Sequence, residues 1–501
     1  MSDARSPLDA IELRIVLGAL HAACAEMGAL LVRAAHSPNI KERRDASSAL
    51  FDARGEMIMQ AEHIPVHLGS MPSAVAAVRD RDQAPGRSWI LNDPYAGGTH
   101  LPDITVVTPA FSSGRLIGFA ATRAHHADVG GTTPGSMPAR SRTLADEGVV
   151  IAPAELEPAL IDALVARMRQ PEERRADLRA QHAANVVGAR RLEELATRLG
   201  EGALSDALES VLDYGERRAR AAIASLGDGV REACDVIEAE EGDLELRVRA
   251  TVTGARIVLD FSGSAAQHPG NLNCPLSVTR SACYFAVRVL SDPGTPPNAG
   301  AHRPVEVRAP EGSLLNARPP AAVAAGNVET SSRVADLVLA AFGRALGQGT
   351  MNNLTLGNER FSYYETLGGG QGACPDADGP NCVHVAMSNT LNTPIEALER
   401  AYPLRVVRYE RRRGSGGAGR WHGGDGVVRE LEALEPMEAS LIAERRRHAP
   451  PGAAGGAPGG VGRDTLDGRP LPGKVTATLE PGARLRIETP GGGGHGAPGS
   501  A

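Results

Sequence analysis

The sequence contains almost no lysine: Lys41 and Lys474 are the two examples among 501 residues, although lysine and arginine together number 53. Acidic residues number 60, so the formal net charge is −7. Because nucleic-acid binding usually needs a basic surplus or a basic stripe, this balance argues against a nucleic-acid partner. The phosphate-binding motif G-x-x-x-x-G-K-[ST] is also missing from the sequence, so we expect no ATP site of that type in this chain.

Aromatic residues, long apolar runs and paired cysteines are scarce as well. Aromatics make up 3% of the chain, so the core must be built mainly from alanine, valine and leucine. We see no apolar run approaching the roughly 20 residues of a membrane helix, and no signal peptide before the first helical pattern. The six cysteines form no C-x-x-C motif. These features favour a cytoplasmic enzyme or enzyme subunit with reduced thiols and no membrane partner.

Glycine and proline are abundant, with 58 and 35 residues, and they separate patterned segments. Apolar residues at helical spacing predict helices over 6–35, 170–226, 276–290 and 331–347. Ser6 is the expected cap of the first helix. Alternating residues predict β-hairpins over 39–60 and 243–262, and the chain after residue 350 is glycine-rich and strand-like.

This mixture predicts an α+β fold, a large mixed unit of antiparallel hairpins and helix blocks that is not doubly wound. We divide the chain into three regions on this basis. Residues 1–230 hold a histidine- and aspartate-bearing hairpin and a helical block, 231–350 a hairpin and a helix, and 351–501 the glycine-rich strands. A single composite unit over about 8–494 is the alternative division.

The strongest chemical pattern is a pair of segments, 92–103 (NDPYAGGTHLPD) and 125–131 (HHADVGG). Two β-type runs lie between them, and the serines and glycine at 112–114 suit a tight turn. The two segments are therefore expected to meet at the open end of one hairpin.

Folding this hairpin about Ser113 places Asp103 opposite Arg123 and His100 opposite His126, to within a residue or two. Directly opposed residues have Cβ atoms about 4.5–5.5 Å apart, so the side chains converge. Two imidazoles and a carboxylate are a common ligand set for a divalent metal with open positions. Since no cysteine takes part, Mn²⁺, Zn²⁺ or Fe²⁺ is favoured. Structural, hydrogen-bonded histidines are the alternative.

Further motifs follow one another along the chain. They are 37–43 (SPNIKER), 63–71 (HIPVHLGSM), 326–330 (GNVET), 349–353 (GTMNN), 364–370 (YETLGGG), 389–394 (NTLNTP), 414–419 (GSGGAG) and 491–494 (GGGG). Together with the two segments above, they make the chain resemble the hydantoinase/oxoprolinase family, specifically its B-type subunit. The chain lacks the charged, helical tail with which family members usually end.

The resemblance implies a two-part enzyme. An A-type partner subunit, of the actin-like ATPase kind, binds ATP and Mg²⁺, and the B-type chain supplies a second active site. The family includes ATP-dependent hydantoinases, 5-oxoprolinases in which both parts are fused and, more distantly, ketone carboxylases. In the carboxylases a B-like subunit holds Mn²⁺. Carried over to this sequence, the implied ligands are His100, Asp103 and His126, with Glu42 as a further acidic ligand.

The implied activity is ATP-dependent opening of a small cyclic amide or imide, such as a hydantoin or 5-oxoproline. In this scheme the partner phosphorylates the amide oxygen, and hydroxide generated at the metal of this chain attacks the activated amide. His125 or Asp128 is expected to act as the acid/base or to orient a ligand, and Lys41 is a weaker candidate beside the substrate carbonyl. His63 and His67 could line the metal pocket or serve as hydrogen-bonded core groups.

Two alternative functions remain open at this point. The same architecture could carboxylate a ketone, or the chain could be a non-catalytic scaffold for the A-type subunit. The presence of His100, Asp103 and His126 argues against the scaffold, because a decayed site would be free to lose such residues.

Overall fold

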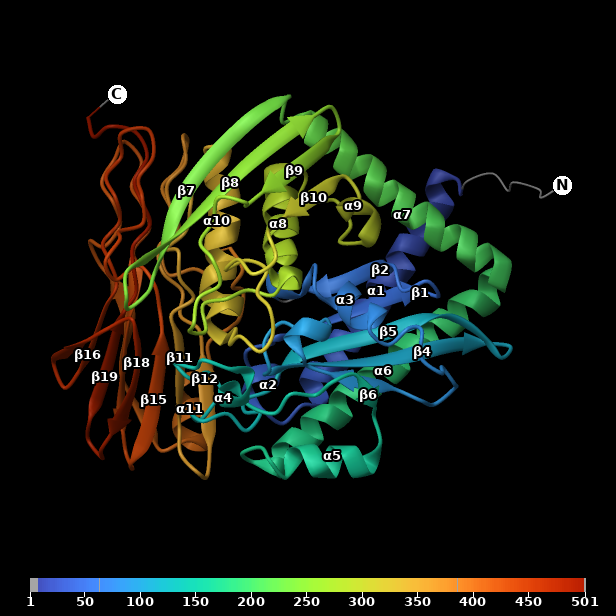
Figure 1. The fold of residues 1–501 in the computed structure, drawn as a ribbon, viewed down its shortest axis with the longest axis horizontal. Coiled ribbons are helices and arrows are strands. Elements are labelled where there is room, and N and C mark those ends of the chain that lie inside the picture. Colours follow the sequence, from blue (N-terminus) through green and yellow to red (C-terminus); the bar gives the residue numbers. More distant parts are fainter. Residues whose placement is uncertain (1–7, 63, 385, 500–501) are drawn as a thin grey trace.

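The computed structural model describes residues 8–62, 64–384 and 386–499. Within this described part, strands are grouped in four sheets and helices pack between and beside them (Figure 1). The C-terminal strands, orange to red, lie at one end of the molecule, and the helices α6 and α7 lie toward the other. The sheets contain mainly antiparallel pairs. The predicted α+β class is confirmed.

The N-terminal sheet carries the hairpin singled out in the sequence. Its strand order is β2-β1-β5-β4-β3-β6. The strands are β1 (Ala46–Asp52), β2 (Met57–Glu62), β3 (Trp89–Leu91), β4 (Asp103–Ser112), β5 (Arg115–His125) and β6 (Ala154–Glu155). The helices α1 (Ala10–Ala34) and α6 (Pro171–Leu199) pack against one another and against this sheet. The short elements of this region are α2 (Pro38–Lys41), η1 (Pro65–His67), α3 (Met71–Ala76), η2 (Pro94–Ala96), α4 (Leu144–Glu147) and α5 (Pro158–Val165).

The first helix begins later than predicted. It is also more apolar than expected, since the sequence analysis found no apolar run approaching the length of a membrane helix. Asp9 caps α1 through the backbone N–H groups of Ile11 and Glu12, while Ser6 lies outside the described residues. By length and composition α1 could cross a membrane, with a mean hydropathy of 1.9 in its most apolar window. Of that window 39% is buried, and side chains such as Leu20 and Met27 belong to the core between α1, α6 and the sheet.

The middle of the chain forms a second sheet with the order β10-β9-β8-β7. Its strands are β7 (Gly229–Glu238), β8 (Asp243–Thr253), β9 (Arg256–Asp260) and β10 (Val305–Arg308). The helices α8 (Leu276–Leu290) and α10 (Ser331–Ala341) pack together, and α10 also packs on β7 and β8. The remaining helices of this region are α7 (Glu201–Ala224), α9 (Ala299–His302) and η3 (Gly326–Thr330), a turn of π-helix directly before α10.

Two further sheets form the C-terminal region, with the orders β12-β11-β15-β18 and β13-β14-β19-β16-β17. Their strands are β11 (Asn353–Gly357), β12 (Ser362–Glu365), β13 (Leu404–Arg412), β14 (Gly426–Ala433), β15 (Met437–Ile442), β16 (Arg463–Leu466), β17 (Arg469–Leu471), β18 (Lys474–Leu479) and β19 (Arg484–Glu488). The helix α11 (Ile395–Ala401) precedes β13. A hydrophobic core lies between these sheets.

Most of the predicted elements are present. The hairpins over 39–60 and 243–262 are β1–β2 and β8–β9, and the helical block over 170–226 is α6 and α7, separated at Gly200. The helix predicted over 331–347 was too long, because α10 ends at Ala341 and Gly343 takes a left-handed φ of 65°. The division into three regions stays a prediction.

The C-terminal glycines allow chain segments to stack backbone on backbone. A Cβ atom added at Gly491 would lie 1.8 Å from the carbonyl oxygen of Ser415, and one at Gly423 would lie 2.0 Å from that of Gly492. The stacked segments are hydrogen-bonded, for example from the N–H of Gly492 to the carbonyl of Gly424 at 2.9 Å. Any side chain at these positions would separate the segments, which explains the glycine runs.

We predict that Gly491→Ala destabilises the protein, because its methyl group must displace backbone atoms. The free energy of unfolding should fall by about 1–3 kcal/mol, the usual penalty for overpacking. Urea unfolding followed by circular dichroism would measure the loss. Gly202→Ala is the matched control, since a Cβ at Gly202 in α7 meets nothing within 4 Å. Equal stability of the two variants would contradict the stacking interpretation.

Candidate metal centre

The β4–β5 hairpin brings the two predicted segments together, in a different register from the one expected. Asp103 lies opposite His125, while Arg123 lies opposite Thr105. The predicted pairing of Asp103 with Arg123 is therefore wrong by two residues.

The shift has two local causes. The turn has two residues with positive φ, Ser113 at 48° and Gly114 at 80°, so its centre lies between them and not at Ser113. The register also changes between Ala110 and Phe111, where a bulge adds a residue to β5.

Three side chains meet at the open end of the hairpin: His100, Asp103 and His125. One ligand atom from each can be chosen so that all lie within 4.8 Å of one another, and all three residues are at most 3% exposed. Asp103 Oδ2 lies 3.4 Å from His100 Nε2, and Asp103 Oδ1 lies 3.4 Å from His125 Nδ1. We call this group the His/Asp cluster.

A fourth side chain, His67, approaches the same carboxylate. Its Nε2 lies 3.4 Å from Asp103 Oδ2, and its Nδ1 pairs with the hydroxyl of Ser47 at 2.9 Å. The turn η1 holds this ring in place, because Pro65 fixes its first residue. His67 thus lies beside the His/Asp cluster and is also a hydrogen-bonded core group, so both roles considered for it stay predictions, while His63 lies outside the described residues.

The His/Asp cluster fits a divalent cation. His67 Nε2, both ring nitrogens of His100 and His125 Nε2 are buried without a hydrogen-bond partner among the described residues. Buried polar atoms are rarely left unpaired unless a water or an ion binds them. A nitrogen–oxygen separation of 3.4 Å is long for a hydrogen bond, but it suits two ligands placed about 2.0–2.2 Å from one ion. Imidazole and carboxylate donors match Mn²⁺, Zn²⁺ or Fe²⁺.

Electrostatics favour the protonation states that bind metal. Burial alone would raise the pKa of Asp103, but the charges of His100 and His67 and the contacts with His100 and His125 hold it well below its usual value. Burial lowers the pKa of His125. A charged carboxylate beside a neutral imidazole is the form that a cation requires. Thr99 also donates to Asp103 Oδ2 at 2.6 Å and fixes its orientation.

Residues of the C-terminal region cover the His/Asp cluster. The ring of Tyr364 in β12 stacks on His125 with centroids 4.4 Å apart and an interplanar angle of 10°. The guanidinium of Arg43 lies 4.7 Å above the Tyr364 ring and donates to the Tyr364 carbonyl at 2.7 Å. The 364–370 motif was a landmark of the resemblance, but nothing in the sequence linked it to the histidines.

His126 lies on the other face of the sheet, because consecutive residues of a strand point in opposite directions. Its Nε2 pairs with Gln181 Oε1 of α6 at 2.9 Å. The structure thus brings His125, and not His126, into the group with His100 and Asp103. This differs from the expected ligand set, and metal binding by either histidine stays a prediction.

The other expected site residues lie in different surroundings. Asp128 accepts hydrogen bonds from the backbone N–H groups of Gly130, Gly135 and Arg169, and also from the Arg169 guanidinium. It therefore orders the loop that follows β5. Lys41 is exposed at the end of α2. Glu42 is half-buried and is not part of the metal-capable group found among the described residues.

One buried acid escaped the sequence analysis. Glu147, in α4, accepts hydrogen bonds from the Ser141 hydroxyl and from the N–H groups of Val323 and Ala324, at 2.7–3.0 Å. Burial raises its pKa to about 7, although the charge of His100 opposes this shift. No sequence pattern marks it, because its partners lie up to 177 residues away.

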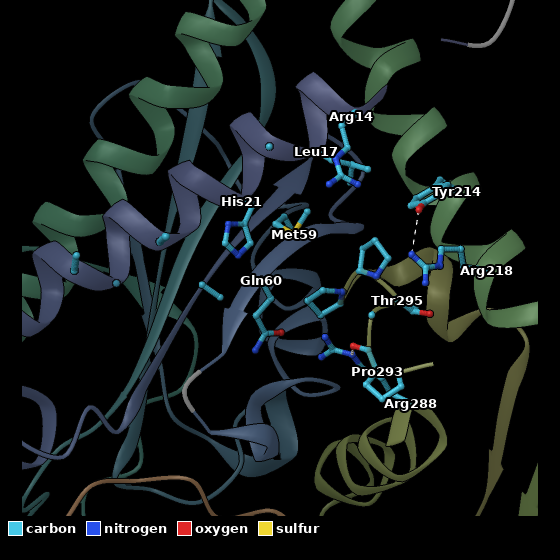
Figure 2. A pocket seen from close by; sticks show the side chains of 18 of the residues that line it. Arg14, Leu17, His21, Met59, Gln60, Tyr214, Arg218, Arg288, Pro293 and Thr295 are labelled. Carbon is cyan, nitrogen blue, oxygen red and sulfur yellow. Dashed lines mark hydrogen bonds between the residues drawn. The ribbon is translucent and has the colours of Figure 1, made fainter. Parts of the chain in front are cut away.

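A large cavity lies elsewhere in the molecule. Its volume is about 870 Å³, and it lies between α1 and the segments carrying Tyr214 and Arg218 (Figure 2). Arg14 and His21 of α1 face it from the other side. No residue of the His/Asp cluster lines this cavity.

We predict that His125→Ala removes bound metal and that His126→Ala retains it. Loss of a direct ligand should weaken metal binding beyond the roughly 10–100-fold that loss of an outer partner causes. Elemental analysis of each variant after metal-supplemented expression would measure this, with the melting temperature as a check on folding. Full metal content in His125→Ala would contradict metal binding by the His/Asp cluster. Loss of metal in His126→Ala alone would instead support the ligands implied by the resemblance, His100, Asp103 and His126.

We also predict a pH dependence of stability that arises from His126. Burial lowers the pKa of this residue below the usual 6.5, so the unfolded chain binds a proton that the folded chain excludes. The free energy of unfolding of the metal-free protein should therefore fall as the pH falls below 6.5. His126→Gln should lose less stability than wild type between pH 7 and 5, by about 2 kcal/mol in urea titrations. Identical pH profiles would contradict a buried neutral imidazole.

Comparison with known proteins shows the family to which the chain belongs. The family model described as hydantoinase B/oxoprolinase matches residues 9–498. An uncharacterized protein of Methanocaldococcus jannaschii is 37% identical over 98% of this chain and 91% of its own length. A protein of a Pseudomonas species, named as a putative B-type subunit of a D-/L-hydantoinase, is 31% identical, over 98% and 90%. 5-oxoprolinase 1 of Arabidopsis thaliana is 38% identical, but the match covers 98% of this chain and 42% of that protein.

Two solved structures share the fold. The ATP-dependent caprolactamase of Pseudomonas jessenii superposes with a TM-score of 0.92 at 28% identity, covering 98% of this chain and 92% of the other. An acetone carboxylase chain superposes with a TM-score of 0.86 at 18% identity, covering 97% and 76%, a likeness of fold alone. The chain spans about two fifths of the length of the 5-oxoprolinases it matches. Matched by the family model along nearly its whole length, the chain belongs to the hydantoinase B/oxoprolinase family.

Proposed function

We propose that this chain is the B-type part of an ATP-dependent hydrolase that opens a small cyclic amide or imide, together with an ATP-binding A-type partner. The observation that carries the proposal is the buried His/Asp cluster, whose imidazole nitrogens include several with no hydrogen-bond partner in the described part of the chain. The cluster offers donor atoms for a cation at a buried site. A cyclic amide bound there would be shielded from bulk water.

The names of similar proteins support this reaction class. One relative is named a 5-oxoprolinase, another a hydantoinase subunit of the B type, and a structural neighbour is an ATP-dependent caprolactamase. All three names refer to cyclic amides or imides. The matched 5-oxoprolinases have more than half of their length outside the region shared with this chain. An ATP-binding part on a separate A-type subunit is therefore our proposal for this protein, and its cytoplasmic location stays a prediction.

The residues that would hold the metal are His100, Asp103 and His125, with His67 beside the same carboxylate. A bound divalent cation would supply Lewis acidity toward a carbonyl oxygen and would lower the pKa of water. Mn²⁺ is favoured by the resemblance to the carboxylases, and Zn²⁺ and Fe²⁺ suit the same donors.

The chain itself prepares this site in two ways. Thr99 and the three imidazoles hold the Asp103 carboxylate in its charged form and in one orientation. Tyr364 covers His125 and is held from above by Arg43, so bulk water is kept from the His/Asp cluster. Charges interact more strongly in such a dry site than in water.

Acid–base roles are assigned from contacts. His125 touches Asp103 directly, so metal binding and proton transfer are two alternatives for one side chain. Glu147, with a pKa raised to about 7, can hold a proton near neutral pH close to His100. Asp128 is occupied by the loop that it orders, and Lys41 is exposed, so we propose no direct chemical step for either.

Two other functions are less well supported. The likeness to acetone carboxylase concerns the fold alone, so it does not favour ketone carboxylation. A purely structural scaffold would have no use for four imidazole nitrogens buried without partners among the described residues.

The proposal predicts that Asp103→Asn abolishes ring opening by the complex of this chain with its A-type partner. Hydantoin and 5-oxoproline are the substrates to assay, and the rate should fall by at least about 100-fold because a charged ligand is lost. His21→Gln, in the unrelated cavity between α1 and α7, is the matched control. A fully active Asp103→Asn complex would overturn the proposed site.

We further predict that the purified chain alone does not hydrolyse ATP, because the nucleotide site belongs to the partner. Phosphate release measured with and without the A-type subunit would test this. ATP hydrolysis by the single chain, abolished by a substitution within it, would contradict the division of labour proposed here.

A further inference from the structure

Three motifs that marked the family resemblance lie far apart in the sequence but meet in the structure. They are 326–330 (GNVET), 349–353 (GTMNN) and 364–370 (YETLGGG). Each contributes one buried side chain to a continuous line of hydrogen bonds, formed by Glu329, Asn353 and Tyr364. The line ends at the His/Asp cluster, because the Tyr364 ring stacks on His125. We call these three side chains the Glu329 tether.

Glu329 begins the tether from η3, the turn of π-helix before α10. Only glycine fits at the start of this turn, since a Cβ at Gly326 would lie 1.8 Å from the carbonyl oxygen of Asn273. Glu329 Oε1 accepts hydrogen bonds from the Met351 N–H at 3.1 Å and from Asn353 Nδ2 at 2.9 Å. Short π-helical turns are frequent at functional sites. This one holds a fully buried carboxyl against the second motif.

Asn353 is the middle of the tether, and the orientation of its amide is fixed. Its Nδ2 also donates to the carbonyl of Ile442 at 3.2 Å, and a carbonyl can only accept. Its Oδ1 therefore faces Tyr364 and accepts a hydrogen bond from the phenol hydroxyl at 2.8 Å. Both Nδ2 protons and the Oδ1 atom are thus paired. The amide cannot turn over without losing these bonds, so the tether has one direction, from the Tyr364 hydroxyl to Glu329.

Tyr364 is held at both ends of its side chain. Asn353 holds the hydroxyl, while Arg43 donates to the Tyr364 carbonyl at 2.7 Å and lies 4.7 Å from the centre of the ring. The ring between these two contacts stacks on His125, with an interplanar angle of 10°. A ring anchored in this way fixes the plane of the imidazole that lies against it.

The orientation of the His125 ring decides which atoms it presents. Its Nδ1 lies 3.4 Å from Asp103 Oδ1, too far for a hydrogen bond that would fix the ring. A half-turn about the bond to Cβ would place carbon atoms where the two nitrogens now lie. Histidines that bind metals are usually oriented by a hydrogen bond to their second nitrogen. For His125 the stacked Tyr364 ring is the contact that hinders this rotation.

The Glu329 carboxyl serves the tether as a hydrogen-bond acceptor, and it needs no charge to do so. Burial raises its pKa to about 8, and the charge of Glu444 acts in the same direction. The group is therefore largely protonated at neutral pH. A glutamine has the same shape and can accept the same two hydrogen bonds, from Met351 and Asn353, whereas a leucine can accept neither.

We propose that Glu329 is a positioning residue of the His/Asp cluster: through Asn353 and Tyr364 it holds the plane of the His125 ring for cation binding. This inference rests on the proposed function, since it concerns the metal centre of that function. No hydrogen bond or ion pair among the described residues joins Glu329 directly to the cluster, so its effect must pass through the tether.

The first measurement is Mn²⁺ binding to the full-length chain, followed by calorimetry without partner or substrate. Glu329→Leu should weaken binding by roughly 10–100-fold, the range found when an outer partner of a metal ligand is lost. Glu329→Gln should bind nearly as tightly as wild type, because it keeps the acceptor. Equal affinity of Glu329→Leu and wild type would overturn the inference.

A double-mutant cycle separates action through the tether from a general effect on the core. Tyr364→Phe keeps the ring but removes the hydroxyl, so it should also weaken Mn²⁺ binding. Adding Glu329→Leu to Tyr364→Phe should then have little further effect, since the link between the two is already broken. The same loss of affinity from Glu329→Leu in both backgrounds would show that Glu329 acts by another route, and the inference would be wrong.

Two further variants guard against misfolding. Asp336→Leu removes another buried acid, from α10, whose Oδ1 has no hydrogen-bond partner in the described part of the chain. It should leave Mn²⁺ affinity unchanged, and the melting temperature of each variant checks its fold. If Glu329→Leu does not fold, Glu329→Asp replaces it in the same cycle, because a carboxyl one methylene shorter cannot reach both donors.

Crystal structures of the metal-free variants distinguish failure of this inference from failure of the proposed function. The rings of Tyr364 and His125 should stay parallel in wild type and Glu329→Gln and should not be parallel in Glu329→Leu. If wild type binds none of Mn²⁺, Zn²⁺ and Fe²⁺, the metal centre of the proposed function fails, and these structures still decide the role of Glu329. If wild type binds metal and the rings stay parallel in Glu329→Leu, the proposed function stands and the inference is overturned.

Discussion

A single buried carboxylate, that of Asp103, holds the candidate site together. Imidazoles reach it from η1, from the loop before β4 and from the end of β5, and each stands 3.4 Å from one of its oxygens. Without a negative charge at this point, the three rings would be buried polar groups with no common partner. The hairpin, the turn that carries His67 and the cover formed by Tyr364 all place their side chains around this one carboxylate.

The scarcity of lysine has a structural counterpart, because the buried cationic side chains of this protein are arginines. The largest fully buried side chains are five arginines, Arg43, Arg123, Arg174, Arg333 and Arg429. A guanidinium offers five donors in a fixed plane, so one side chain can bind several carbonyls and hydroxyls at once. Arg43 does so with the Tyr364 carbonyl and the hydroxyls of Thr366 and Thr390, joining the C-terminal region to the N-terminal sheet. A lysine ammonium could not span these acceptors.

The sequence predicted the hairpin, the class of fold and the meeting of two polar segments, because turn chemistry and alternation are local properties. It could not decide between His125 and His126. Neighbouring strand residues face opposite sides, and the sequence defined the register only to within a residue or two, so it could not select one of the two histidines. Glu147 and Tyr364 could not be found at all, since their contacts join residues far apart in the chain, and no local pattern distinguishes a buried acid from an exposed one.

The stacked glycines also constrain the order in which the protein can form. The run at 491–494 lies against the carbonyls of Gln371, Ser415 and Ala418, positions made about 75–120 residues earlier in the chain. The earlier loops already hydrogen-bond to one another, as from the N–H of Gly424 to the carbonyl of Gln371 at 2.9 Å, and residues 491–494 complete this packing. Because residues 491–494 contact loops about 75–120 residues earlier in the chain, the packing of these loops is complete only after that segment has been synthesised, and it depends on contacts of long sequence separation.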